Sequence, residues 1–154
     1  MSSLELKLPP DVVWVVVGGL MWLASRVTAG GLGAVESFRR PLAALLIVMG
    51  TALIVAARVA LERAGTTWHP TKPDRTTALV TSGAYGFSRN PTYLGMEIVL
   101  LSWAVLLASP AAVLVSALFV FYTGRFQIQP EESILSASLG QEYRDYMQRV
   151  RRWV

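Results

Sequence analysis

The sequence contains no cysteine, so a disulfide framework, a thiol nucleophile and a thiolate metal site are all excluded. It has one histidine, His69, which is too few for the usual multi-histidine metal centres, and we expect no metal. Charged residues are scarce as well, at 16% of 154 residues, whereas hydrophobic residues make up 53%. This balance is typical of an integral membrane protein. Membrane orientation explains the net charge of +4 better than nucleic-acid binding does, so we expect no nucleic acid.

Four apolar segments predict an all-α integral membrane protein with four transmembrane helices, because a span needs about 20 apolar residues. The predicted spans lie at about residues 12–29, 41–61, 91–108 and 111–124, in a single membrane domain of residues 1–154. Only Ser109-Pro110 separates the last two spans, so these are expected to form a tight hairpin. The first span is short enough for a signal-peptide core, but its acidic flanks favour a retained helix.

Basic residues are distributed unevenly about these spans. The N-terminal arm, the loop 62–90 and the tail carry ten Lys and Arg residues, and the opposite side carries three. The positive-inside rule therefore predicts that both termini are cytoplasmic, in what we expect to be a prokaryotic cytoplasmic membrane. The loop 62–90 then shares the cytoplasmic face with an amphipathic C-terminal helix at 130–150, which begins at Pro130 and has Gly140 as a break.

A polar loop runs directly into the third apolar segment. Gly83 and Gly86 indicate turns, and Asn90-Pro91 indicates a helix start with Asn as the N-cap. Arg89 precedes the free N–H groups of that helix, which is a favourable arrangement for an anion. The simpler alternative is a well-capped helix with an arginine and a tyrosine at the membrane interface.

Two ionisable residues, Arg58 and Glu97, fall within apolar spans, where an unpaired charge costs about 2.5–3.5 kcal/mol. We predict that they pair with each other, or that Arg58 snorkels to the headgroups or pairs with Glu62. Arg89, Tyr93 and Glu97 recur at a spacing of four and predict one polar stripe facing protein. Glu97 is accordingly expected to face a passage for substrate between helices.

Two sets of motifs resemble a known family. They are Gly83-Ala84-Tyr85 with the run from Arg89 to Gly95, and Glu131-Glu132 with Leu139-Gly140, Tyr143, Tyr146 and Val150-Arg151-Arg152. In order and spacing they resemble the integral-membrane methyltransferases that include isoprenylcysteine carboxyl methyltransferases and phospholipid N-methyltransferases. The resemblance covers roughly residues 66–154. Asn90 stands where that family usually has His, so a role in binding is retained at this position but a role in proton transfer is not.

The resemblance implies S-adenosylmethionine as cofactor and a lipophilic acceptor at the cytoplasmic face of the membrane. The implied cofactor-binding residues are His69, Gly83, Tyr85, Arg89, Asn90, Tyr93, Gly95, Glu131 and Glu132. Glu97, Arg58 and Arg89 are the catalytic candidates. A carboxylate acceptor of the isoprenylcysteine type is favoured and would gain from a nearby arginine. A lipid amine is also possible and would need a carboxylate such as Glu97 to take its proton.

Two other readings of the sequence remain open. The first is an NADPH-dependent membrane reductase of the sterol-reductase type, whose C-terminal region resembles this one. Besides Arg89, the 2'-phosphate of that cofactor would require an additional basic cluster in the loop 66–90, for which Lys72 and Arg75 are the only candidates. The second is a non-catalytic membrane protein whose capped helices and basic tail serve assembly.

Overall fold

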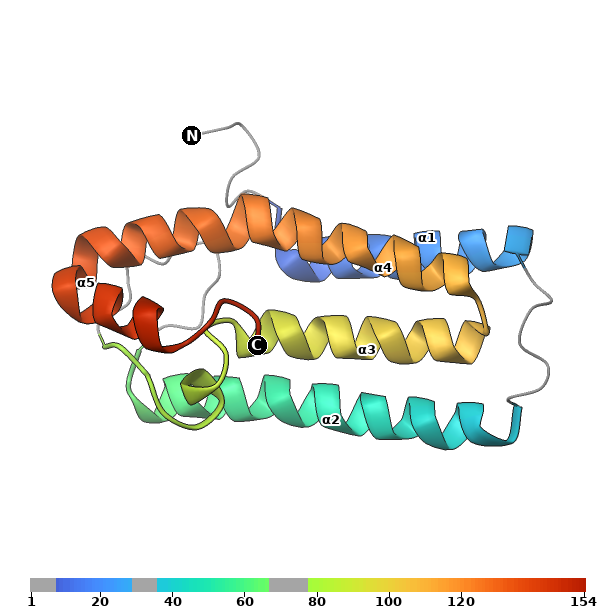
Figure 1. Ribbon diagram of the computed structural model, residues 1–154, viewed down its shortest axis with the longest axis horizontal. Coiled ribbons are helices and arrows are strands. Elements are labelled where there is room, and N and C mark those ends of the chain that lie inside the picture. Colours follow the sequence, from blue (N-terminus) through green and yellow to red (C-terminus); the bar gives the residue numbers. More distant parts are fainter. Residues whose placement is uncertain (1–7, 29–35, 67–77) are drawn as a thin grey trace.

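The fold is all-α in the computed structural model, which describes residues 8–28, 36–66 and 78–154. The helices are α1 (Pro10–Thr28), α2 (Glu36–Arg63), α3 (Pro91–Leu107), α4 (Pro110–Thr123) and α5 (Gln129–Arg149), with a 3₁₀ turn η3 (Gly83–Gly86) and a π-helical turn η4 (Gly124–Ile128). α1 to α4 run side by side, and α3 packs on both α2 and α4 (Figure 1). α5 continues beyond α4 and folds back, so that the end of the chain lies beside the start of α3.

Three of these helices are long and apolar enough to cross a membrane: α1, α2 and the continuous run from α4 into α5. α3 is apolar but has 17 residues, which gives it a length of about 26 Å against a hydrocarbon core of about 30 Å. The membrane class predicted from composition is confirmed, and the count of four spans stays a prediction. The run from Pro110 to Arg149 is kinked at Gly140, and its part before the kink would extend about 45 Å, so it cannot lie wholly within a hydrocarbon core of about 30 Å.

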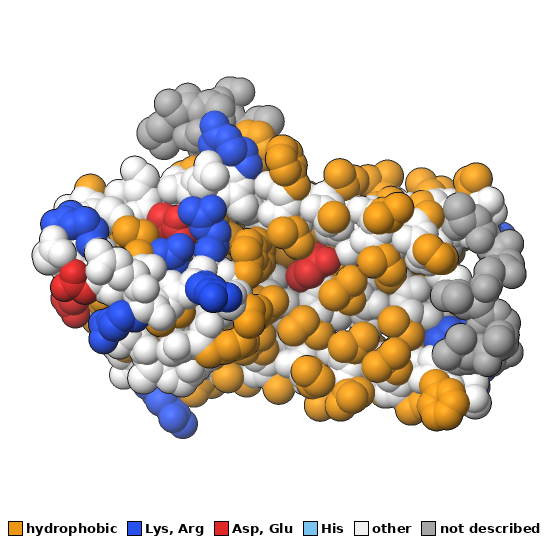
Figure 2. Space-filling model, viewed as in Figure 1, with side chains coloured by type: hydrophobic (Ala, Val, Ile, Leu, Met, Phe, Trp, Pro, Cys, Tyr) orange, Lys and Arg blue, Asp and Glu red, His pale blue; other side chains and the backbone are white. Residues whose placement is uncertain are grey.

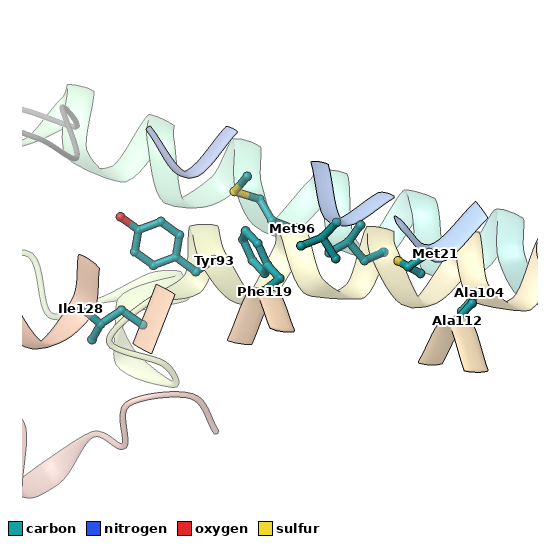
Figure 3. Close-up of a cluster of buried hydrophobic side chains, with 9 residues drawn as sticks. Met21, Tyr93, Met96, Ala104, Ala112, Phe119 and Ile128 are labelled. Atoms are coloured by element: carbon teal, nitrogen blue, oxygen red, sulfur yellow. The ribbon is translucent and has the colours of Figure 1, made fainter. Parts of the chain in front are cut away.

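A core of apolar side chains from α1, α3 and α4 holds the bundle together. Met21 and Phe119 are fully buried, and Met96 packs near Phe119 on the facing helix (Figure 3). Ala104 and Ala112 face each other where α3 and α4 approach the hairpin. That hairpin is closed by Ser109, whose hydroxyl accepts a hydrogen bond from the Ala112 N–H at 3.2 Å. The tight connection expected from Ser109-Pro110 is therefore present.

α2 and α3 cross at two glycines. A Cβ atom added to Gly95 would lie 2.6 Å from the carbonyl oxygen of Gly50, and one added to Gly50 would lie 2.7 Å from the carbonyl oxygen of Gly95. Only glycine permits such close approach of two helix backbones, which is a common device where helices pack within a membrane. Gly95, predicted to bind cofactor, instead allows α3 to pack on α2.

Two predicted helix boundaries are wrong. The second helix begins at Glu36, with Pro41 inside it and not at its start. Pro41 lies near enough to the start that only one turn precedes its missing N–H. The C-terminal helix does not start anew at Pro130 but continues from α4 through η4, where the N–H of Gln129 bonds to the carbonyl of Gly124. The predicted break at Gly140 is confirmed by its φ of 61°.

Side-chain chemistry divides the molecule into two ends. Apolar side chains cover the bundle, and charged ones gather over α5 and the loops beside it (Figure 2). The start of α1, the end of α2, the start of α3 and all of α5 lie at this polar end. Gln127 joins η4 to the residues before α1 at this end, because its buried side-chain amide donates a 2.7 Å hydrogen bond to the carbonyl of Leu8.

Candidate active site

The loop 78–90 carries the first half of the predicted site. Its single 3₁₀ turn, η3, begins at Gly83, whose φ of +62° is a conformation that other residues rarely adopt. The Tyr146 hydroxyl of α5 donates a 2.6 Å hydrogen bond to the carbonyl of Tyr85 in this turn. The loop is thus held in place by the helix that carries the second half of the site.

Glu132 is the anionic centre of an ion-pair cluster. Its carboxylate lies 3.1 Å from the Arg89 guanidinium, with the two side chains 12% and 11% exposed. Arg152 binds the same carboxylate through two nitrogens, Nη2 at 2.6 Å and Nε at 3.2 Å. Two arginines therefore fix Glu132, and this arrangement of charge-assisted hydrogen bonds orients Arg89.

Glu131 has a different environment from its neighbour. Its Oε1 accepts a 2.7 Å hydrogen bond from the hydroxyl of Tyr93. Burial raises the pKa of Glu131 to about 8, and the negative charge of Glu132 adds to the effect. Glu131 is thus a carboxyl group in a poorly solvated setting that would gain from a cation placed beside it.

Three backbone-directed hydrogen bonds join the residues before α3 to the tail, and we call them the tail clasp. The Arg89 N–H donates to the Arg151 carbonyl at 3.0 Å, and the Ser88 hydroxyl donates to the Arg152 carbonyl at 3.4 Å. The Asn90 Nδ2 group donates to the same Arg152 carbonyl at 3.0 Å. Asn90 occupies the N-cap position, but its side chain does not cap α3. The predicted side-chain capping is wrong: the Asn90 side chain is directed to the tail, where its Nδ2 group donates to a carbonyl, and its oxygen accepts no N–H of the first turn of α3.

These groups surround a cavity of about 510 Å³ at the polar end. This volume lies within the range of about 300–1,000 Å³ typical of small-molecule sites. The polar and aromatic residues of its wall come from five segments: Asp11, Trp14, Arg58, Tyr85, Arg89, Asn90, Thr92, Tyr93, Glu131, Glu132, Tyr143 and Tyr146. Apolar side chains such as Ile54, Leu135 and Leu139 complete it. The cavity is therefore amphipathic, with cations, anions and aromatic rings around one space.

Three tyrosines of the wall remain neutral hydrogen-bonding groups. Burial raises the pKa of Tyr85 and of Tyr143, and it raises the pKa of Tyr146 to about 12. Their hydroxyls keep their protons near neutral pH, and their rings provide flat apolar surface.

Not every predicted site residue lies at this cavity. Of the catalytic candidates, Arg58 and Arg89 line it, but Glu97 does not. The predicted pair of Arg58 with Glu97 is wrong, because Arg58 forms its 3.1 Å ion pair with Glu62, one of the weighed alternatives. Glu97 Oε1 lies 2.8 Å from the hydroxyl of Ser116 on α4. Since α3 begins only at Pro91, Arg89 is not part of a helical stripe with Glu97.

The cofactor-binding predictions divide in a similar way. Tyr85, Arg89, Asn90, Tyr93, Glu131 and Glu132 line the cavity. Gly95 lies against α2, and Gly83 lines a separate groove on the outer side of the loop. His69 falls outside the described residues.

Sequence reasoning missed two contributors to the site. Arg152 was recognised as part of a motif but given no role, although its contact with Glu132 joins residues 20 positions apart. Trp14 fits an interfacial anchor by its position near the start of the first apolar segment, but its indole N–H donates a 2.9 Å hydrogen bond to the Met96 carbonyl, and the residue lines the cavity. A tryptophan near the start of an apolar segment suits both roles, so only the packing of α1 on α3 distinguishes them.

The residues present fit S-adenosylmethionine. Arg89 Nε is buried and has no hydrogen-bond partner within the described residues, so it could donate to the carboxylate of that molecule. Glu131 could accept a hydrogen bond from the ammonium group of S-adenosylmethionine or lie near its sulfonium. Either cation would offset the cost of burying this carboxylate. The tyrosine and tryptophan rings offer flat surfaces for an adenine.

Comparison with known proteins gives the family. The family model for phospholipid methyltransferases matches residues 38–142. The chain is 34% identical over 109 residues to the protein-S-isoprenylcysteine O-methyltransferases of Rattus norvegicus and Mus musculus, a stretch that covers 69% of this chain. It spans little more than a third of those relatives, 37% and 38% of their lengths. An uncharacterized protein of Haemophilus influenzae is 40% identical over 62 residues, which cover 40% of this chain and 98% of that protein. Since the family match extends over more than half of the chain, the chain belongs to the phospholipid methyltransferase family, a family of membrane methyltransferases.

Proposed function

We propose that this chain transfers a methyl group from S-adenosylmethionine to a lipophilic acceptor at the cytoplasmic face of a membrane. The observation that carries the proposal is the amphipathic cavity at the polar end, where Arg89, Glu131 and Glu132 meet around about 510 Å³. Family membership supports the reaction class, and the names of the two mammalian relatives point to an isoprenylcysteine carboxylate as acceptor.

S-adenosylmethionine supplies an electrophilic methyl group on a sulfonium. The residues of this chain bind and orient the two substrates and exclude water from them. Arg89 would hold the donor carboxylate through its unpartnered Nε, while Glu132 and Arg152 keep the guanidinium in place. Glu131, oriented by Tyr93, would hold the donor cation. Positioning of this kind is the main contribution that a protein can make to an in-line displacement.

The acceptor enters the same cavity from a side that carries Arg58. A carboxylate acceptor needs no general base and is favoured by a nearby cation, and Arg58 lines the wall. A lipid amine is the second candidate, favoured by the name of the matching family and by a third carboxylate of the wall, Asp11, beside Glu131 and Glu132. An amine must lose a proton before or during methyl transfer, and a carboxylate of the wall could accept it.

Thermal stabilisation of the detergent-solubilised protein tests donor binding. A ligand at about 100 times its Kd stabilises the folded state by about 2.7 kcal/mol. We expect S-adenosylhomocysteine to raise the Tm and NADPH to leave it unchanged. Stabilisation by NADPH alone, or by neither ligand, would overturn the proposal.

Transfer of a radiolabelled methyl group then identifies the acceptor. The two substrates to compare are an N-acetylcysteine S-alkylated with a C15 isoprenoid and a phosphatidylethanolamine in nanodiscs. We expect base-labile methyl ester on the first. Label that is stable to base and remains with the phospholipid would assign an amine acceptor instead.

A further inference from the structure

A second hollow lies next to the donor cavity, on the outer side of α2. It is an open hollow of about 1,140 Å³ between that helix and the loop residues 79–84. Its helical wall runs from Ile47 to Arg63, 16 steps along the axis and thus about 24 Å. We call it the α2 groove. It is longer than one leaflet of the hydrocarbon core, which is about 15 Å thick.

The lining of the α2 groove is suited to a hydrocarbon chain. Ala52, Ala56 and Ala60 follow one another at a spacing of four, which places three small side chains in one line along the helix, and Ala64 follows in the turn after it. Valines and Ile47 flank this line, and Arg63, in the last turn of α2, is the only charged residue among the described residues of the wall. Small side chains leave room along α2. The polar side chains of the described lining are those of Thr51, Thr81, Ser82 and Arg63, so the helical wall is largely apolar and the loop side carries two hydroxyls.

α2 is also the most lipid-accessible of the candidate spans. Within its apolar window 17% of residues are buried, against 28% for α1 and 33% for the run that contains α4. A molecule dissolved in the bilayer can therefore reach the α2 groove laterally, without passing between packed helices.

The α2 groove and the donor cavity share a wall. Leu79 and Val80 line both spaces, so one side of this pair faces the cavity and the other faces the groove. The end of α2 contributes a cation to each space, Arg58 to the cavity and Arg63 to the groove. A headgroup beside Leu79 and Val80 would thus lie near both arginines while its chain extends away along α2.

We propose that the α2 groove binds the hydrocarbon chain of the methyl acceptor, an isoprenoid or fatty acyl chain, while the headgroup enters the donor cavity over Leu79 and Val80. The inference rests on the proposed function and adds the route and chain site of the acceptor. From the sequence, the substrate was expected to pass between helices beside Glu97. We instead place the entry of the acceptor at the α2 groove.

Filling the α2 groove tests this assignment. Ala56→Trp puts a large ring into the groove from an exposed position on α2. Leu45→Trp introduces the same side chain at an exposed position of the same helix that lines neither the groove nor the donor cavity. We expect Ala56→Trp to raise the KM for the C15 isoprenoid acceptor at least tenfold. The KM for a C5 analogue and the Kd for S-adenosylhomocysteine should stay within twofold of the unsubstituted protein. Leu45→Trp should change none of the three.

An unchanged KM for the C15 acceptor in Ala56→Trp would overturn the proposal and leave ordinary bilayer lipid as the occupant. Loss of donor binding in that variant would also count against it, because the substitution would then act through the fold. A change of oligomeric mass by native mass spectrometry in Ala56→Trp but not in Leu45→Trp would assign the groove to a second copy of the chain.

A second measurement keeps the inference separate from the proposed activity. A C15 isoprenoid carrying a terminal diazirine is illuminated with the protein in nanodiscs, and the labelled peptides are mapped. We expect label within residues 47–64, reduced at least fivefold in Ala56→Trp, whether or not any methyl transfer is seen. Label spread over all lipid-facing helices would overturn the chain site even if the protein proves to be a methyltransferase.

Discussion

Glu131 and Glu132 are adjacent in the sequence but have different partners and therefore different roles. One step along a helix turns the side chain by about 100°, which carries Glu132 toward two arginines and leaves Glu131 with a tyrosine. The sequence predicted that both carboxylates belong to the site, and both line the cavity. It could not predict which of them is neutralised, because Arg152 reaches Glu132 only after the chain folds back at Gly140.

The raised pKa of Glu131 predicts proton release on donor binding. At pH 7, below a pKa of about 8, the free protein holds this carboxyl mostly protonated. A cationic donor favours the carboxylate, so binding expels the proton, and the affinity rises with pH up to about 8 and is level above it. Calorimetry with S-adenosylmethionine in buffers of different ionisation enthalpy measures the released protons.

Glu131→Gln should release fewer protons at pH 7 and show a flatter dependence of donor affinity on pH. Glu142→Gln, an exposed position on the same helix, serves as the control and should behave like the unsubstituted protein. Equal proton release in all three proteins would mean that Glu131 does not contact the donor cation.

At the level of secondary structure, the contacts of the tail with the site could not be predicted from the order of residues in the sequence. They comprise the tail clasp and the ion pair of Arg152 with Glu132. Arg152→Ala removes the bidentate contact with Glu132 and lets Arg89 and Glu132 shift together. Hydrogen bonds to charged groups contribute about 1.5–3 kcal/mol, so we expect donor affinity to fall by at least tenfold in a calorimetric titration. Arg151→Ala is the matched control, since its side chain is exposed and only its backbone carbonyl takes part in the clasp. Equal affinities of the two variants would show that Arg152 does not position the donor site.

The crossing of α2 and α3 gives a second prediction at this scale. Gly95→Ala would place a methyl group 2.6 Å from a backbone carbonyl that cannot move without its helix. Overpacking of this kind costs about 1–3 kcal/mol, more than the gain of about 1 kcal/mol in helix propensity, so the Tm in detergent should fall. In Gly19→Ala the added methyl group meets nothing within 4 Å, so this variant should keep or raise the Tm. A Gly95→Ala protein as stable as Gly19→Ala would show that the crossing relaxes.

The bounds of the apolar helices were predictable from hydropathy to within a few residues. The predictions that took a proline as the first residue of a helix were correct at some prolines and wrong at others. Pro91 and Pro110 do begin their helices, but Pro41 and Pro130 lie inside continuing ones. The residue type is the same in all four cases. What differs is whether the preceding turn can do without the missing N–H, and a local pattern does not contain that information.

For the whole molecule, the polar end and the basic asymmetry lead to a topology prediction. The structure places the start of α1 and the end of the chain at one end of the bundle, as four antiparallel spans require. Ten basic residues against three predict that this end is cytoplasmic. Reporter fusions at Val154 should therefore be active only in their cytoplasmic form. Activity of an external reporter at that position would reverse the orientation and place the donor cavity on the wrong side.

The π-helical turn η4 has a consequence for the way this protein tolerates insertions and deletions. It holds one residue more than an α-helical turn, since Gln129 bonds to Gly124 five positions back. Each residue of an α-helix contributes about 100° of rotation, and the π turn absorbs its extra residue without turning α5. Loss of one residue between 124 and 128 would let the turn close as an ordinary α-helix and leave Glu131 and Glu132 facing nearly the same way. A residue added there would turn both carboxylates away from Arg89 by about 100° with every side chain of the site intact. In this short stretch a one-residue deletion should therefore be tolerated better than a one-residue insertion.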